Sequence, residues 1–209
     1  MAGERLAVRL TTREGEAASM PCTGRTCVSI RWVVGWLMLL ACTSSHAAER
    51  YAIATQQSQM QFKAYSVFAK PLGKFHTFSG EIVADAQQPG ASQVRLVIEA
   101  RSIDTDNAER DEHLRSKDFL FVDKYPTITF VSTAITGAGP AYTVQGDLTM
   151  RGVTQHLTIP VTVEQRQNEV VVRGNTSLSR KAFGITYNAF FNPVQDRVDV
   201  IFTIVGVKQ

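Results

Sequence analysis

The sequence predicts an all-β domain, an antiparallel barrel or sandwich, over residues 48–209. Three observations predict it. Apolar residues there alternate with polar ones at a period of two, which is typical of strands with one face buried. Turn-forming residues separate the alternating runs at short intervals. Little helix is expected between the runs, and closely spaced strands of this kind favour antiparallel pairing over a parallel sheet.

Seven alternating runs give the expected strands. They cover residues 59–64, 94–100, 128–132, 142–149, 157–164, 170–172 and 198–204. The expected turns are at residues 88–90, 137–140, 151–152 and 167–168. Because no internal repeat or low-complexity linker interrupts this part of the chain, we expect a single domain.

One segment departs from the strand pattern. Asp106 and Glu109 have the spacing of a capping box, in which Asp106 accepts a backbone N–H three residues on and Glu109 reaches back. The residues that follow are good helix formers, so we expect one short helix at about 107–116. Leu114 would face inward and the charged side chains would face water.

The first 47 residues predict a signal peptide, not part of the fold. A positive flank at Arg31 precedes ten apolar residues, 32–41, and small polar residues follow. Ten residues span about 15 Å as a helix, too short for the roughly 30 Å core of a bilayer. We expect cleavage near Ala47 and export to the periplasm. Residues 1–19 are unusually polar for such a leader, so we expect them to be an untranslated extension.

All three cysteines, Cys22, Cys27 and Cys42, fall in this leader. The exported domain would then hold no disulfide and no thiolate metal site. The residues up to Cys42 resemble a lipobox, which leaves lipidation of Cys42 and an outer-membrane lipoprotein as an alternative to cleavage near Ala47. Residues 48–209 carry 17 basic and 16 acidic side chains, so charge gives no reason to expect nucleic acid.

Aromatic side chains cluster in the strands and in irregular segments such as 74–78 and 189–193. An eight-stranded barrel is just wide enough to be filled by side chains or to hold one small ligand, and periodicity does not decide between the two. If the barrel is hollow, segments 119–125 and 183–191 are candidate gates. The candidate tunnel residues are Phe62, Phe75, Phe78, Leu114, Phe119, Phe130, Tyr187 and Phe202.

Longer motifs resemble a known family. Residues 102–119 (SIDTDNAERDEHLRSKDF), 125–132 (YPTITFVS) and 146–154 (GDLTMRGVT) are similar in order and spacing to the YceI family of exported bacterial lipid-binding proteins. The resemblance covers about residues 51–207. It implies an extended lipocalin-like barrel of eight antiparallel strands with a small helix, holding a polyisoprenoid, quinone or similar amphiphile, with a periplasmic location and no catalysis.

One departure from the family concerns the polar head of the ligand. Many members carry a histidine shortly after the strand that matches residues 59–65, and residues 65–68 here contain none. Arg110 and Arg115 are candidate contacts to an anionic or carbonyl head group, because guanidinium suits such oxygens. The alternative is that they belong to a salt-bridged helix surface that closes the barrel and anchors residues 118–125.

Catalytic and metal-binding chemistry finds little support. His76, His113 and His156 lack the i, i+4 spacing of a helical zinc motif. There is no Gly-x-Ser-x-Gly nucleophile motif and no glycine-rich phosphate loop. We therefore expect no catalytic residue, no metal and no cofactor.

The expected function is non-catalytic binding, storage or transport of one long apolar amphiphile, such as a polyisoprenoid, isoprenoid quinone or fatty-acyl lipid. The partner is this hydrophobic small molecule, and a homodimer is left open. A membrane would enter only as the source of lipid or through an anchor at Cys42. Two alternatives remain: a structural or interaction protein with a filled barrel, and an enzyme that acts on a bound lipid.

Overall fold

A computed structural model describes residues 48–67, 70–188 and 193–209. The expected signal peptide, with Cys42, lies outside the described residues, and so do Phe68 and residues 189–192. Within the described ranges, no helix combines the length and the apolar character that crossing a bilayer requires.

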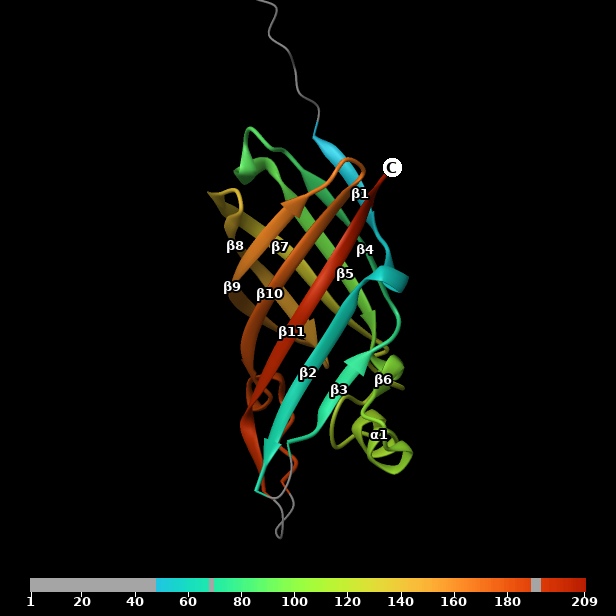
Figure 1. The fold of residues 1–209 in the computed structure, drawn as a ribbon. Helices are drawn as coiled ribbons and strands as arrows, with labels where there is room; N and C mark the ends of the chain where they lie inside the picture. The colour runs from blue at the N-terminus through green and yellow to red at the C-terminus, as the bar shows by residue number, and fades with distance from the viewer. Residues whose placement is uncertain (1–47, 68–69, 189–192) are drawn as a thin grey trace, which may run out of the picture. The chain divides into compact units, whose positions relative to one another are not determined.

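Eight antiparallel strands close a barrel (Figure 1). They are β1 (Glu49–Ile53), β4 (Phe78–Ala84), β5 (Gln93–Glu99), β7 (Thr127–Ala138), β8 (Ala141–Met150), β9 (Val153–Gln165), β10 (Glu169–Ser179) and β11 (Val194–Lys208). They follow this order around the ring, and pairing of β1 with β11 closes it. Closure removes the unpaired edges that an open sheet would expose. The predicted antiparallel barrel is confirmed.

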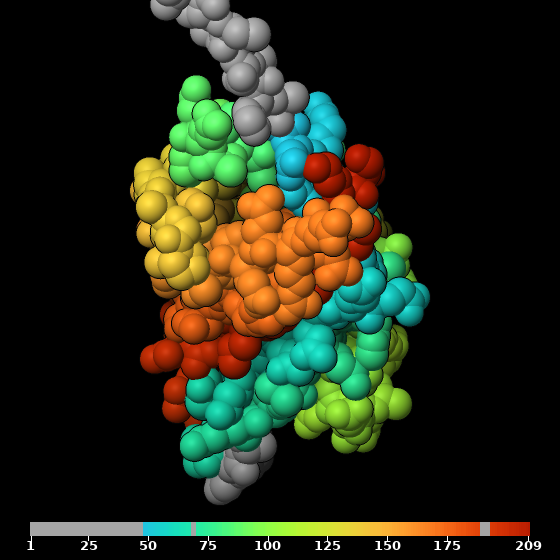
Figure 2. Space-filling view, turned by 45° about the horizontal axis from the view of Figure 1, so that its top comes forward, coloured from blue at the N-terminus to red at the C-terminus, as the bar shows by residue number. Residues whose placement is uncertain are grey.

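The wall is longer at one end because β11 is long. Its residues 206–208 pair with β1, whereas residues 194–203 pair with β2 (Gln59–Ser66). Strand β2 pairs with β3 (Leu72–Phe75), and β3 pairs with β6 (Ile103–Asp104). Figure 2 shows the outer surface of this wall, with β10 in orange and β2 in cyan. We call this end the helix end, because α1 (Ala108–Arg115) follows β6 there, and we call the end closed by β1 the far end.

All seven expected runs form strands, and each expected turn lies at a junction between consecutive strands. Strands β1, β3, β4 and β6 were not expected. In β4, Gly80 interrupts the apolar row of Phe78 and Ile82, while β3 and β6 have only four and two residues. An alternation with a period of two cannot be recognised in such short or interrupted strands.

The helix α1 spans the expected residues but begins differently. Asn107 is its N-cap, and the Asn107 side-chain oxygen accepts the backbone N–H of Arg110. Asp106 has a φ of 58°, a left-handed conformation that lies outside the helix. The expected cap at Asp106 is therefore wrong by one residue. The Asp106 N–H, which Glu109 was expected to reach, donates instead to the carboxylate of Asp104.

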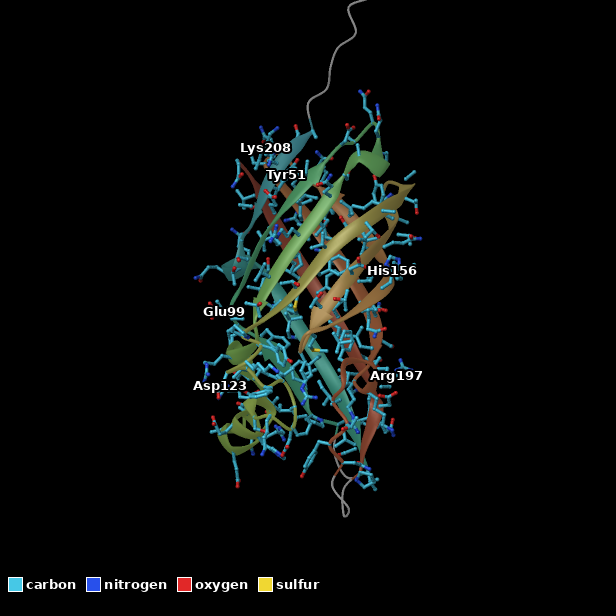
Figure 3. All side chains as sticks on the ribbon, turned by 180° about the vertical axis from the view of Figure 1, so that it is seen from behind. Tyr51, Glu99, Asp123, His156, Arg197 and Lys208 are labelled. Carbon is cyan, nitrogen blue, oxygen red and sulfur yellow. The ribbon has the colours of Figure 1, made fainter. Side chains whose placement is uncertain are left out.

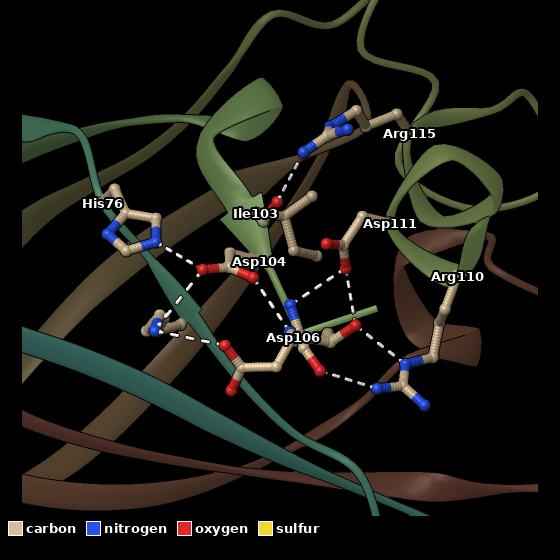
Figure 4. Close-up of polar contacts among 9 residues, drawn as sticks. His76, Ile103, Asp104, Asp106, Arg110, Asp111 and Arg115 are labelled. Atoms are coloured by element: carbon tan, nitrogen blue, oxygen red, sulfur yellow. Dashed lines mark hydrogen bonds and ion pairs between the residues drawn. The ribbon is translucent and has the colours of Figure 1, made fainter. Parts of the chain in front are cut away.

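Not all charged side chains of α1 face water, contrary to expectation. Asp111 is only 6% exposed, and one of its carboxylate oxygens accepts the backbone N–H and the hydroxyl of Thr105. Arg115 donates to the carbonyl oxygens of Arg101 and Ile103. The helix α1 is thus held to the chain on both sides of Asp104: Arg115 binds Ile103, and Asp111 binds Thr105 (Figure 4).

Asp104, the last residue of β6, joins this strand to β3 (Figure 4). Its carboxylate lies 2.6 Å from Nε2 of His76 and 3.4 Å from Nζ of Lys74, and it accepts the N–H of Asp106. The hydrogen bond from His76, followed by that from Asp106, lowers the pKa of Asp104 from 3.8 to about 2. The folded chain therefore favours the charged carboxylate.

This shift predicts an acid-sensitive contribution to stability. Because the pKa is lower in the folded chain, the contribution of Asp104 is complete above its ordinary pKa of 3.8 and is lost as the pH falls toward about 2. We expect Asp104→Asn to lower the melting temperature at neutral pH and to reduce its fall in the acid range. Thermal unfolding followed by circular dichroism measures both effects. An equal acid-range fall in the two proteins would contradict the assignment.

Candidate ligand-binding site

The barrel encloses a cavity of about 490 Å³. Every strand of the ring contributes inward side chains to its wall, and β2, β3, β6 and α1 complete it at the helix end. Small-molecule sites are typically mostly apolar spaces of about 300–1,000 Å³. The sequence left a filled and a hollow barrel open, and the structure shows a hollow one.

Three glycines make room for the aromatic part of the wall. The pairs are Phe62 with Gly73, Phe130 with Gly146, and Phe202 with Gly174. A Cβ on these glycines would lie 2.2, 2.4 and 2.5 Å from the respective rings, closer than carbon atoms can approach. Each ring therefore occupies the space over a glycine that a side chain would fill. This position keeps the ring against the wall.

Seven of the eight predicted tunnel residues line the cavity: Phe62, Phe75, Leu114, Phe119, Phe130, Tyr187 and Phe202. Phe78 does not line it. It is 4% exposed and packs within the core at the start of β4, opposite Ile98 of β5. Phe78 thus supports the barrel and has no face toward the cavity.

An aromatic cluster of His113, Phe119 and Tyr187 stands at the helix end of the cavity. The ring centroids of the three pairs are 4.8–5.0 Å apart, and His113 meets both other rings edge-on. The His113 side chain is 44% exposed, so the cluster reaches from the cavity to the surface. Phe119 and Tyr187 come from the two segments expected to gate the barrel, and they meet here. Phe183, from the second segment, is buried in the core.

The two candidate head-group arginines have different surroundings. Arg110 lines the cavity, and its guanidinium donates to the hydroxyl and the carbonyl oxygen of Thr105. A guanidinium has five N–H donors, and these two bonds use only two of them. Arg115 does not line the cavity, because its guanidinium is turned to the carbonyls that hold α1 to β6. Only Arg110 is placed to meet a ligand.

Arg180 is a buried wall residue that the sequence did not reveal. It is 5% exposed and donates to four carbonyl oxygens, those of Ile185, Tyr187, Val194 and Gln195. It therefore ties both sides of the segment that carries Tyr187. Nothing in the sequence marks this arginine, at the end of a polar strand, as buried.

The polar lining residues are confined to one half of the cavity. They are Gln61, Thr105, Arg110, His113, Thr176, Arg180 and Tyr187. All belong to the half in which β11 pairs with β2, and the rest of the wall is apolar. No carboxylate lines the cavity among the described residues. The site is thus an apolar chamber with a positively charged, hydrogen-bonding end.

The remaining histidines lie apart from the cavity. His156 is on the outer surface, where Nδ1 lies 2.9 Å from Asp147 (Figure 3), and His76 binds Asp104. No group of three or more potential metal ligands occurs among residues 48–67, 70–188 and 193–209. Sequence reasoning weighed His113 only as part of a metal or acid–base site and overlooked Thr105, although both lie in the quoted motif at 102–119.

Comparison with known proteins identifies the family. The model of the YceI-like domain matches residues 51–206. The chain belongs to this family. A UPF0312 protein of Yersinia enterocolitica is 33% identical over 182 residues, covering 84% of this chain and 94% of the relative. A UPF0312 protein of Pseudomonas aeruginosa is 35% identical over 66% of this chain and 74% of its own length.

Solved structures agree with this YceI-like fold. BcnA of Burkholderia cenocepacia superposes with a TM-score of 0.69 at 27% identity, covering 73% of this chain and 98% of that protein. A polyisoprenoid binding domain from Saccharophagus degradans gives a TM-score of 0.63 at 17% identity, covering 78% and 99%. The extended lipocalin-like barrel implied by the sequence motifs is confirmed.

The contact between Phe62 and Gly73 can be tested directly. A Cβ at position 73 would meet only side-chain atoms, those of Phe62 and Thr105. We expect Gly73→Ala to push the Phe62 ring toward the lumen and to destabilise the fold by about 1–3 kcal/mol. Denaturant unfolding measures the loss, and the double variant Gly73→Ala with Phe62→Leu should recover part of it. Gly90→Ala is the matched control, because the atom nearest to its Cβ would be the carbonyl oxygen of Ile135 at 3.9 Å, an ordinary contact distance. Equal effects at positions 73 and 90 would contradict the argument.

Proposed function

We propose that this YceI-like protein binds and carries one long apolar amphiphile in the periplasm, without catalysis. The observation that carries the proposal is the chamber itself: a hollow barrel whose wall is apolar except at the helix end. Burying an apolar chain gains about 0.8 kcal/mol per CH₂ group. Ten such groups would provide about 8 kcal/mol before the cost of association, so a long hydrocarbon needs no special polar contact.

The asymmetry of the wall orients the ligand. Its head group would lie at the helix end, near Arg110 and the aromatic cluster, and its chain would extend toward the far end. With no carboxylate in the described wall, the site favours a head that accepts hydrogen bonds, such as a carbonyl, a hydroxyl or an acid. The fold shared with the Saccharophagus degradans polyisoprenoid binding domain supports an isoprenoid chain as one occupant.

The two other functions fit the wall less well. A filled barrel that serves only as an interaction module is contradicted by the cavity. An enzyme acting on the lipid would need an acid–base pair at the reacting atoms. In the described wall, Arg180 is occupied by backbone carbonyls. His113 stands against aromatic rings, and its carboxylate partner, Asp118 at 3.8 Å, does not line the cavity.

Native mass spectrometry tests the carrier function. The full chain, expressed with its leader in a Gram-negative host, is expected in the periplasmic fraction with a hydrophobic adduct of about equimolar amount. Extraction with organic solvent and mass analysis then identify the adduct. Recovery of ligand-free protein from the periplasm would contradict the proposal. Recovery in the membrane fraction with an acylated Cys42 would contradict the soluble location and support the lipoprotein alternative.

The head-group contact is tested by comparing Arg110 with Arg115. Losing a hydrogen bond to a charged group costs about 1.5–3 kcal/mol. We therefore expect Arg110→Ala to weaken binding of a long-chain fatty acid about tenfold or more, and binding of the matching fatty alcohol less. Arg115→Ala should lower the melting temperature and leave both affinities unchanged. Displacement of a fluorescent lipid measures the affinities. A lower melting temperature with unchanged affinity in Arg110→Ala would show that Arg110 is purely structural.

A further inference from the structure

A second cavity of about 300 Å³ lies in the far end of the barrel. It shares five wall residues with the main cavity: Ile82, Val94, Val144, Val161 and Val172. These come from β4, β5, β8, β9 and β10, one from each strand, and all are branched aliphatic side chains. They lie on five of the eight strands around the lumen, and we call them the aliphatic ring. The two cavities are thus consecutive chambers that meet at this ring.

Several polar groups of the second cavity already have partners in the protein. The hydroxyl of Tyr51 donates to Glu49 at 2.5 Å, and Lys208 reaches the same carboxylate at 2.6 Å. Burial, with the hydrogen bond to Glu49 next, raises the pKa of Tyr51, which keeps the hydroxyl protonated as the donor. The carboxylate of Asp85 accepts the backbone N–H of Gln87. Figure 3 shows Tyr51 and Lys208 together at this end.

These contacts favour an apolar occupant. A ligand head group at the far end would have to break bonds that the protein has already made, whereas a hydrocarbon end would not. The sides of this cavity offer it apolar contacts from residues such as Ala84, Ile135, Val163 and Val170. A chain too long for the main cavity must either continue past the aliphatic ring or leave its excess length in water, at about 0.8 kcal/mol per CH₂ group.

We infer that the second cavity is a terminal chamber for the apolar end of the ligand, and that the aliphatic ring, Val172 in particular, determines which chain lengths the barrel can enclose completely. The inference rests on the proposed function, because it requires the head group to lie at the helix end. Val172 is the ring member of choice for substitution, since it is only half-buried and lines both cavities. A larger side chain there would extend into the passage.

A fluorescence experiment places the chain end. The sequence has two tryptophans, Trp32 and Trp36, both outside residues 48–209. In a chain starting at Ala48, Tyr142→Trp therefore puts a single indole in the second cavity, where Tyr142 contributes to the wall. The probes are ω-bromo fatty acids of increasing length, whose bromine quenches a nearby indole. Displacement of a fluorescent lipid measures the affinity of each acid in parallel.

The expected result is a length threshold. Short acids should bind without quenching the indole, and acids above a certain length should bind and quench it. Quenching by short and long acids alike, or tight binding of long acids without quenching, would overturn the inference and leave the binding function standing. Failure of every acid to bind would instead overturn the proposed function, and the terminal chamber with it.

A second experiment blocks the passage at the aliphatic ring. Val172→Phe should remove the gain in affinity of long acids over short ones, by about fourfold for each methylene excluded. Val131→Phe makes the same substitution at a position that is 46% exposed on the outer face, and it should change neither series. An unchanged long-chain gain in folded Val172→Phe would overturn the inference. If that variant does not fold, the quenching threshold in Tyr142→Trp decides the question by itself.

Discussion

The open lumen depends on three contacts in which a phenylalanine ring lies over a glycine of a neighbouring strand. An eight-stranded barrel is narrow enough for side chains to fill, so rings directed at its axis would close it. Phe62 and Gly73 are direct cross-strand partners, and so are Phe202 and Gly174. A slip of one residue would turn these side chains to the other face of the sheet. The pairing register of the strands therefore also determines whether the interior stays hollow.

The length of β11 gives the chamber its polarity. One part of this 15-residue strand closes the ring with β1, and the other carries β2 and, through it, β3 and β6. The polar lining residues of the described wall lie at this end of the barrel, on the added strands, on α1 and on the lower part of β10 with the segment that follows it. The contacts that hold α1 to β6 use carbonyl oxygens and the carboxylate of Asp111, so they fix the helix without placing an acid in the cavity. This topology gives the described wall a charged end that no carboxylate lines.

The strands were predictable and the hollow was not, for a physical reason. In β5, β8 and β9 one face is buried, so a period of two is written into the sequence. An inward apolar residue has the same signature whether it meets another side chain or empty space. Phe78 and Phe130 differ only in their neighbours: Phe78 lies opposite Ile98 and packs in the core, whereas Phe130 covers Gly146 and faces the lumen. Likewise, Asp111 can be buried because the N–H and the hydroxyl of Thr105 donate hydrogen bonds to it. The periodicity of the helix does not predict such a contact.

A hollow core also couples occupancy to stability. Side chains that line the lumen have no protein neighbour on their inner side, so they lack the dispersion contacts that a filled core would give them. The closed ring of strands and the buried residues at its ends, such as Tyr51 and Phe183, supply packing outside the lumen. A bound chain restores the missing contacts and stabilises the fold by mass action. For a carrier, the loaded barrel is then the more stable state, and release requires a competing apolar phase such as a membrane.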